Sequence, residues 1–120
     1  MERVQFIEHK GKRVLIIDFQ GCTAEEMYAV VDQVEEVVTA QPRGSVLLVA
    51  DFTGTKVTKD TAGRIKEATA RDVPYVKHAA WVGVEAIPAP LFRAIEAFST
   101  RKFVPFKTRA DALDWLVEQN

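Results

Sequence analysis

Short aliphatic runs alternate with longer amphipathic segments along this chain, and this alternation restricts the folds open to it. Residues 46–50 form a continuous aliphatic run that ends at Asp51, which is typical of a strand covered on both faces. Residues 23–41 instead begin with the capping-box pair Thr23 and Glu26. The apolar residues of this segment recur at helical spacing on one face: Met27, Val30, Val31, Val34 and Val38. We therefore expect a helix followed by a buried strand.

The same criteria assign the rest of the chain. Strands are predicted at 4–8, 13–19, 46–50, 76–84 and 103–106, and helices at 23–41, at 58–72, from Pro88 and Pro90 onward, and after the caps Thr108 and Asp111. A turn containing Gly11 joins the first two strands as a hairpin. The order ββαβαβαβα predicts an α/β fold, with one layered domain over 1–120 and a mostly parallel five-stranded sheet with helices.

Two of these elements have further predicted properties. Pro105 cannot donate a ladder hydrogen bond, so the strand at 103–106 should lie at an edge of the sheet. The residues of the second helix that should face the core are mostly small: Ala62, Ile65 and Ala68. Because small side chains bury little area, we expect this helix to be lightly packed.

Composition narrows the setting in which the chain works. No apolar run approaches the roughly 20 residues that span a bilayer, so we expect no membrane insertion. No secretion signal is visible, and Cys22 is the only cysteine, which together predict a cytoplasmic protein. The net charge of -1 predicts no nucleic-acid partner.

Several stretches resemble the SpoIIAA-like group of STAS-related bacterial proteins. They are 13–19 (RVLIIDF), 48–53 (LVADFT), 74–77 (PYVK) running into 82–84 (VGV), and 111–116 (DALDWL). The resemblance covers nearly the full length, but each stretch is a core pattern and not a catalytic signature. It implies the α/β fold and a binding or regulatory module.

STAS-type anti-sigma-factor antagonists carry a phosphorylation switch in an Asp-Ser-Ser-Gly motif at the start of a helix. Here Asp60 and Gly63 match that motif, Thr61 takes the place of the first serine, and Ala62 replaces the serine that is phosphorylated. The resemblance therefore implies that the usual switch is absent. Thr61 remains a candidate phosphorylation site, because a helix N-terminus stabilises negative charge. The alternative is that Thr58, Asp60 and Thr61 simply cap the helix.

The string 51–55 (DFTGT) is similar to the phosphorylation motifs of P-type ATPases and haloacid dehalogenase-like phosphatases. In those families an aspartate at the end of a parallel strand attacks a phosphoryl group with the help of magnesium. Thr53 replaces the second aspartate of the phosphatases, and no later acidic pair completes a magnesium site. We therefore predict no enzyme activity, no metal and no cofactor. Asp51 should end its strand by accepting loop N–H bonds, with phosphotransfer through Asp51 as an alternative.

Open α/β sheets place their ligand crevices at the carboxyl ends of the strands. Together with the start of the second helix, this edge gives a candidate binding surface: Asp18, Asp51, Thr53, Gly54, Thr55, Thr58, Asp60, Arg64, Gly83 and Glu85. The segment 23–41 is acidic, whereas 54–77 carries six basic residues. A basic face on the second helix would suit an acidic partner or lipid headgroups, but solvated helix faces commonly have this composition, and we favour that interpretation.

We therefore expect a non-catalytic STAS-like module that recognises a protein partner or a small ligand through the second helix and the strand-end loops. One alternative is a carrier of a lipid or another apolar molecule, because this fold group also resembles the SEC14-type lipid-binding domains. A cavity lined by Trp81, Phe92, Ile95 and Phe98 would favour the carrier. The edge strand and the hairpin also make a homodimer possible.

Overall fold

The computed structural model describes residues 2–97 and 104–119. Its elements are β1 (Val4–His9), β2 (Lys12–Asp18), α1 (Ala24–Thr39), β3 (Val46–Asp51), α2 (Lys59–Asp72), β4 (Val76–Val82), a 3-10 turn η1 (Val84–Ala86), α3 (Ala89–Ala97), β5 (Val104–Phe106) and α4 (Arg109–Glu118). This order confirms the predicted ββαβαβαβα pattern. Phe98 and Phe103, which we placed in a helix and a strand, lie outside the described residues.

The prediction was wrong at the end of the fourth strand. We expected it to continue to Val84, but it ends at Val82. Gly83 takes a left-handed conformation, with φ of 71°, and η1 begins directly after it. A left-handed residue turns the chain out of the extended path, and glycine adopts that conformation without a steric penalty.

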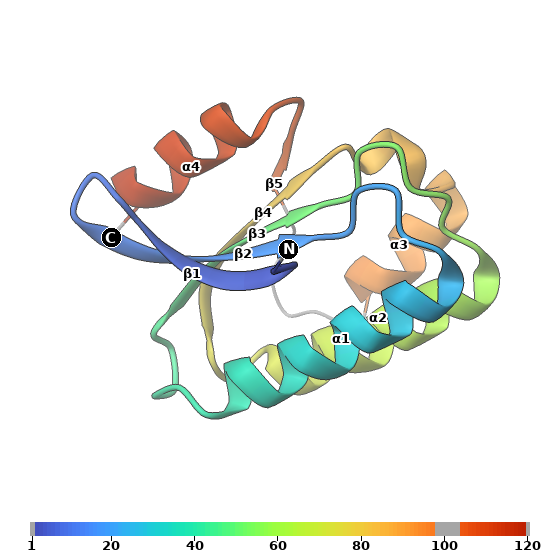
Figure 1. Ribbon diagram of the computed structural model, residues 1–120, viewed down its shortest axis with the longest axis horizontal. Helices are drawn as coiled ribbons and strands as arrows, with labels where there is room; N and C mark the ends of the chain where they lie inside the picture. Colours follow the sequence, from blue (N-terminus) through green and yellow to red (C-terminus); the bar gives the residue numbers. More distant parts are fainter. Residues whose placement is uncertain (1, 98–103, 120) are drawn as a thin grey trace.

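The strands of the described residues lie in the sheet in their sequence order, β1-β2-β3-β4-β5. β1 is antiparallel to β2, and each later neighbour is parallel to the one before it. Successive right-handed crossovers in one direction place their helices on one face of a sheet. Accordingly α1, α2 and α3 cover one face, and α4 covers the other (Figure 1).

Side chains of the central strands alternate between two cores. In β3, Leu48 and Ala50 face the three-helix side, whereas Leu47 and Val49 face α4. The uninterrupted aliphatic run at 46–50 therefore reflects burial on both faces, as predicted. β5 lies at an edge of the sheet, which confirms the position inferred from Pro105.

The predicted caps and turn are also present. The side chain of Thr23 accepts a hydrogen bond from the Glu26 amide and Glu26 accepts one from the Thr23 amide, which completes the capping box of α1. Thr108 caps α4 by accepting from the Asp111 amide. In the β1-β2 hairpin, Lys10 and its neighbouring glycine both have positive φ, as a tight two-residue turn requires.

Candidate functional site

Two buried aspartates end adjacent strands at the edge where we expected a binding surface. Asp18 ends β2 and Asp51 ends β3, and the two residues are paired in the parallel register. Oδ1 of Asp18 accepts from the Gln20 amide at 2.9 Å, and Oδ1 of Asp51 accepts from the Thr53 amide at 3.0 Å. Each carboxylate therefore ends its strand by holding the loop that follows, as predicted for Asp51.

A single arginine bridges these two carboxylates. Nε of Arg109, the first residue of α4, donates to Oδ2 of Asp51 at 2.8 Å. Its Nη2 lies 3.2 Å from Oδ1 of Asp18, although the geometry is not that of a hydrogen bond. Sequence reasoning missed Arg109, because it is far from both aspartates along the chain and belongs to no motif.

The surroundings of Asp51 bear on the phosphotransfer alternative. Its side chain is 5% exposed, and each of its two oxygens already accepts a hydrogen bond. A nucleophilic aspartate needs a free oxygen and a metal beside it. Among the described residues, no three His, Cys, Asp or Glu side chains are arranged to hold a metal ion. The geometry supports a structural role for Asp51.

The other strand-end residues fall into two groups. Thr55 and Gly83 are buried, whereas Thr53, Gly54 and Glu85 are exposed. The Thr55 hydroxyl donates to the carbonyl of Phe19, which ties the loop after β3 to the end of β2. A Cβ atom on Gly83 would lie 2.6 Å from the Thr53 nitrogen, so the loops after β3 and β4 approach too closely for a side chain.

Thr61 is inside the N-terminal cap of α2. Its hydroxyl accepts from the Thr58 amide at 2.9 Å, and its own amide donates to the Thr58 hydroxyl at 3.3 Å. Thr61 is 2% exposed, whereas Thr58 and Asp60 are exposed. A kinase would reach the Thr61 hydroxyl only after the first turn opened, so the geometry favours the capping role.

Two basic residues of α2 pair with acidic residues of α1. Arg64 donates to Glu35 at 2.8 Å and to Asp32 at 2.7 Å, and Arg71 donates to Glu35 at 3.1 Å. The hydrogen bond from Arg64 lowers the pKa of Glu35. Arg64, which the sequence analysis placed in the candidate binding surface, thus pairs with α1 within the chain. The opposite charges of the two segments serve helix packing.

A cavity of about 380 Å³ lies between the sheet and the helices α1 and α2, and it continues past the edge of β4 toward α4. Its described lining is mostly aliphatic and aromatic: Ile17, Phe19, Val31, Val34, Leu48, Ala50, Phe52, Ile65, Ala68, Thr69, Asp72, Val73, Val76, His78, Ala79, Trp81, Val104, Trp115 and Gln119. The lining includes Ile65 and Ala68 of α2. This confirms the prediction that α2 is lightly packed, because small side chains on its inner face leave space above the sheet.

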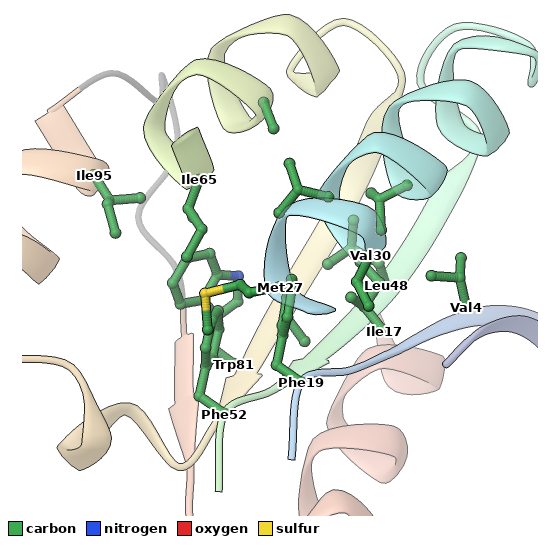
Figure 2. Close-up of a cluster of buried hydrophobic side chains, with 14 of the residues drawn as sticks. Val4, Ile17, Phe19, Met27, Val30, Leu48, Phe52, Ile65, Trp81 and Ile95 are labelled. Atoms are coloured by element: carbon green, nitrogen blue, oxygen red, sulfur yellow. The ribbon is translucent and has the colours of Figure 1, made fainter. Parts of the chain in front are cut away.

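Stacked aromatic rings line one part of this cavity. The rings of Phe19 and Phe52 stack with their centroids 4.8 Å apart. The ring centroids of Phe52 and Trp81 are 4.7 Å apart. Figure 2 shows Ile65 reaching from α2 toward Trp81. Of the residues whose cavity would favour a carrier, the described lining includes Trp81 but neither Phe92 nor Ile95.

Asp72 is the one carboxylate among the described lining residues. It ends α2, it is 6% exposed, and its Oδ1 has no hydrogen-bond partner in the described part of the chain. Burial raises the pKa of Asp72 to about 7, and the nearby charge of Glu35 adds to this effect. Arg64 and Arg71 act in the opposite direction but more weakly. Sequence reasoning missed Asp72, although an acidic residue at a helix C-terminus opposes the helix dipole and is a usable signal.

Comparison with known proteins identifies the fold. No protein-family model and no curated protein sequence matches the chain. A crystal structure of an uncharacterised protein from the DUF3478 family, with a SpoIIAA-like fold, from Shewanella loihica PV-4 superposes with a TM-score of 0.72. The superposition covers 94% of this chain and 91% of that one, at 18% sequence identity. The chain therefore has the predicted SpoIIAA-like α/β fold. Within residues 2–97 and 104–119, no helix combines the length and apolar character needed to cross a bilayer.

Proposed function

We propose that this chain is a non-catalytic binding module that holds a small, mainly apolar molecule in the cavity beneath α2. The cavity volume carries this proposal. Ligand pockets usually measure about 300–1,000 Å³, and an engineered apolar cavity of about 150 Å³ already binds benzene. At about 380 Å³, this cavity exceeds the small packing defects found in ordinary cores.

Of the functions predicted from the sequence, the carrier of an apolar molecule has the most support. Arg64 and Arg71, two of the charged side chains on α2, already pair with α1, whereas Lys59 and Asp60 of this helix are exposed. The hydrogen bonds to both oxygens of Asp51 argue against phosphotransfer. Recognition of a protein through the exposed residues Thr53, Gly54 and Glu85, and pairing of two copies through edge strands, stay predictions.

The experiment measures binding of a neutral fluorescent dye for apolar sites, N-phenylnaphthylamine, to the purified protein. We expect saturable binding, with fluorescence enhancement as the dye leaves water. Ala68→Leu adds bulk to the cavity lining, so it should weaken dye binding by about tenfold. Native mass spectrometry of gently purified protein would also detect a retained ligand.

Ala70→Leu is the matched control. Ala70 is exposed on the same helix, and alanine and leucine have similar helix propensities. It should leave dye affinity unchanged. If the wild-type protein does not bind the dye, or if both variants bind it as the wild type does, the cavity is not a binding site and the proposal is wrong.

A further inference from the structure

We propose that the molecule held in the cavity carries an ammonium group, and that this group donates a hydrogen bond to the carboxylate of Asp72. The natural ligand would then be a small amphiphilic amine: an apolar body among the aromatic and aliphatic side chains, with one cationic nitrogen at the end of α2. This inference rests on the proposed function, because it assigns the chemistry of that same ligand.

The first argument is the missing partner of Asp72. The large majority of buried side-chain polar atoms in proteins have a hydrogen-bond partner, and leaving one without a partner is costly. Oδ1 of Asp72 is fully buried and has none among the described residues, although Asp72 lines a cavity with room for a ligand. A donor on the ligand would complete this site.

The second argument is the charge balance where α1 meets the end of α2. Three carboxylates lie there, on Asp32, Glu35 and Asp72, together with the guanidinium groups of Arg64 and Arg71. The hydrogen bonds that these two arginines donate to acidic side chains go to Asp32 and Glu35. Among the described residues, Asp72 is therefore the carboxylate of this cluster that accepts no hydrogen bond from an arginine, and it lines the cavity.

This charge balance distinguishes between classes of ligand. An alcohol would satisfy the hydrogen-bonding need of Asp72 but would leave its charge uncompensated in an apolar site. A carboxylate ligand would place a second negative charge beside the first. An ammonium supplies both the donor and the charge, and the rings of Trp81 and Trp115 in the same lining attract cations as well.

The pairing requires an ionised Asp72, so pH should affect binding. In the described part of the chain, the charged or titratable groups around Asp72 are Glu35 on α1, Arg64 and Arg71 on α2, and His78 on β4, which lines the same cavity. Because burial raises the pKa of Asp72 to about 7, its carboxylate forms mainly above neutral pH. Amine affinity should therefore rise between pH 6 and pH 8, while the affinity for a neutral alcohol should change little.

The experiment compares three probes with the same apolar chain, namely octylamine, 1-octanol and octanoate, by calorimetric titration at pH 8. In the wild-type protein we expect the amine to bind about tenfold more tightly than the alcohol, and the carboxylate to bind most weakly. Asp72→Asn keeps the shape of the side chain and removes its charge, so it should abolish the preference for the amine while the alcohol still binds. Glu67→Gln, at an exposed position of α2, should leave the preference intact.

The possible failures are distinguishable. The ammonium proposal is wrong if octanol binds and octylamine binds no better, or if the preference for the amine survives in Asp72→Asn. In either case the proposal that the cavity binds an apolar molecule still holds. If none of the probes binds and the dye does not bind either, both proposals fail. If Asp72→Asn does not fold, the affinities of the three probes for the wild-type protein still test the ammonium proposal.

Discussion

Among the described residues, buried carboxylates occur at two places, and their surroundings differ. At the strand ends, Asp18 and Asp51 hold their own loops and share Arg109. At the end of α2, Asp72 is about as deeply buried as these two aspartates. It lines the cavity, and its Oδ1 has no hydrogen-bond partner in the described part of the chain. A carboxylate whose bonds are complete stabilises the fold. One whose bonds are incomplete lowers stability until something else binds it.

The largest expected effect tests how tightly the strand-end region is packed. Gly83→Ala should lower the free energy of unfolding by about 3 kcal/mol, because the new Cβ would meet the backbone of Thr53 at a positive φ. Gly54→Ala is the control, since Gly54 also has positive φ but open space around it, and it should cost about 1 kcal/mol. Urea denaturation measures both values. Equal losses would show that the close approach of the two loops contributes nothing.

The next effect tests the arginine bridge. Asp51→Asn should destabilise the protein by about 2 kcal/mol, because it removes the charge that holds Arg109 while the new side chain can still accept from Thr53. Arg109→Gln should cost a similar amount. The double variant should lose clearly less than the sum of the two, since the same contact is removed in each. Additive losses in urea denaturation would contradict the bridge.

The smallest effect has the opposite sign. Asp72 has a raised pKa of about 7 in the folded protein, against ~3.9 in an unfolded chain, so the folded state holds the extra proton between these values. Stability should therefore fall as pH rises from about 4 to 7. Asp72→Asn should gain about 1 kcal/mol at pH 8, less than the pKa shift alone allows, because the amide also lacks partners. The gain should vanish near pH 4.

Urea denaturation of the wild type and Asp72→Asn at both pH values checks this prediction. An amine bound to Asp72 should reverse it, so that the wild type becomes the more stable protein at pH 8. A loss of stability in Asp72→Asn at pH 8 without ligand would show that the carboxylate already has a stabilising partner, and would remove the contrast between the two regions.

The fold could be predicted from the sequence because the local patterns are consistent with the overall topology. The aliphatic run at 46–50, the capping box at Thr23 and the small inner face of α2 each predicted a feature that the structure contains. The end of β4 was harder to predict. Gly83 ends the strand through its backbone conformation, whereas the apolar pattern continues through it to Val84.

The candidate site was only partly accessible. The role of Asp51 in ending its strand could be predicted, because Asp51 follows a buried aliphatic run. Its contact with Arg109 could not be predicted, because the two residues are far apart along the chain and no local motif indicates the contact. The basic face of α2 was visible, but its partner was not, since the pairing of Arg64 with Glu35 depends on how two helices pack. Asp72 matters because of a cavity, and a cavity is a property of three-dimensional packing.

The order of the strands has a consequence for synthesis. α1, α2 and α3 cover their face of the sheet as the chain grows, but α4 follows all five strands and covers the other face. Until Ala112 and Leu116 of α4 have emerged from the ribosome, no helix covers the side chains of Val14, Ile16 and Val49 on this face of the sheet. A nascent chain at that stage presents an apolar sheet to solvent, and we expect chaperones to bind it.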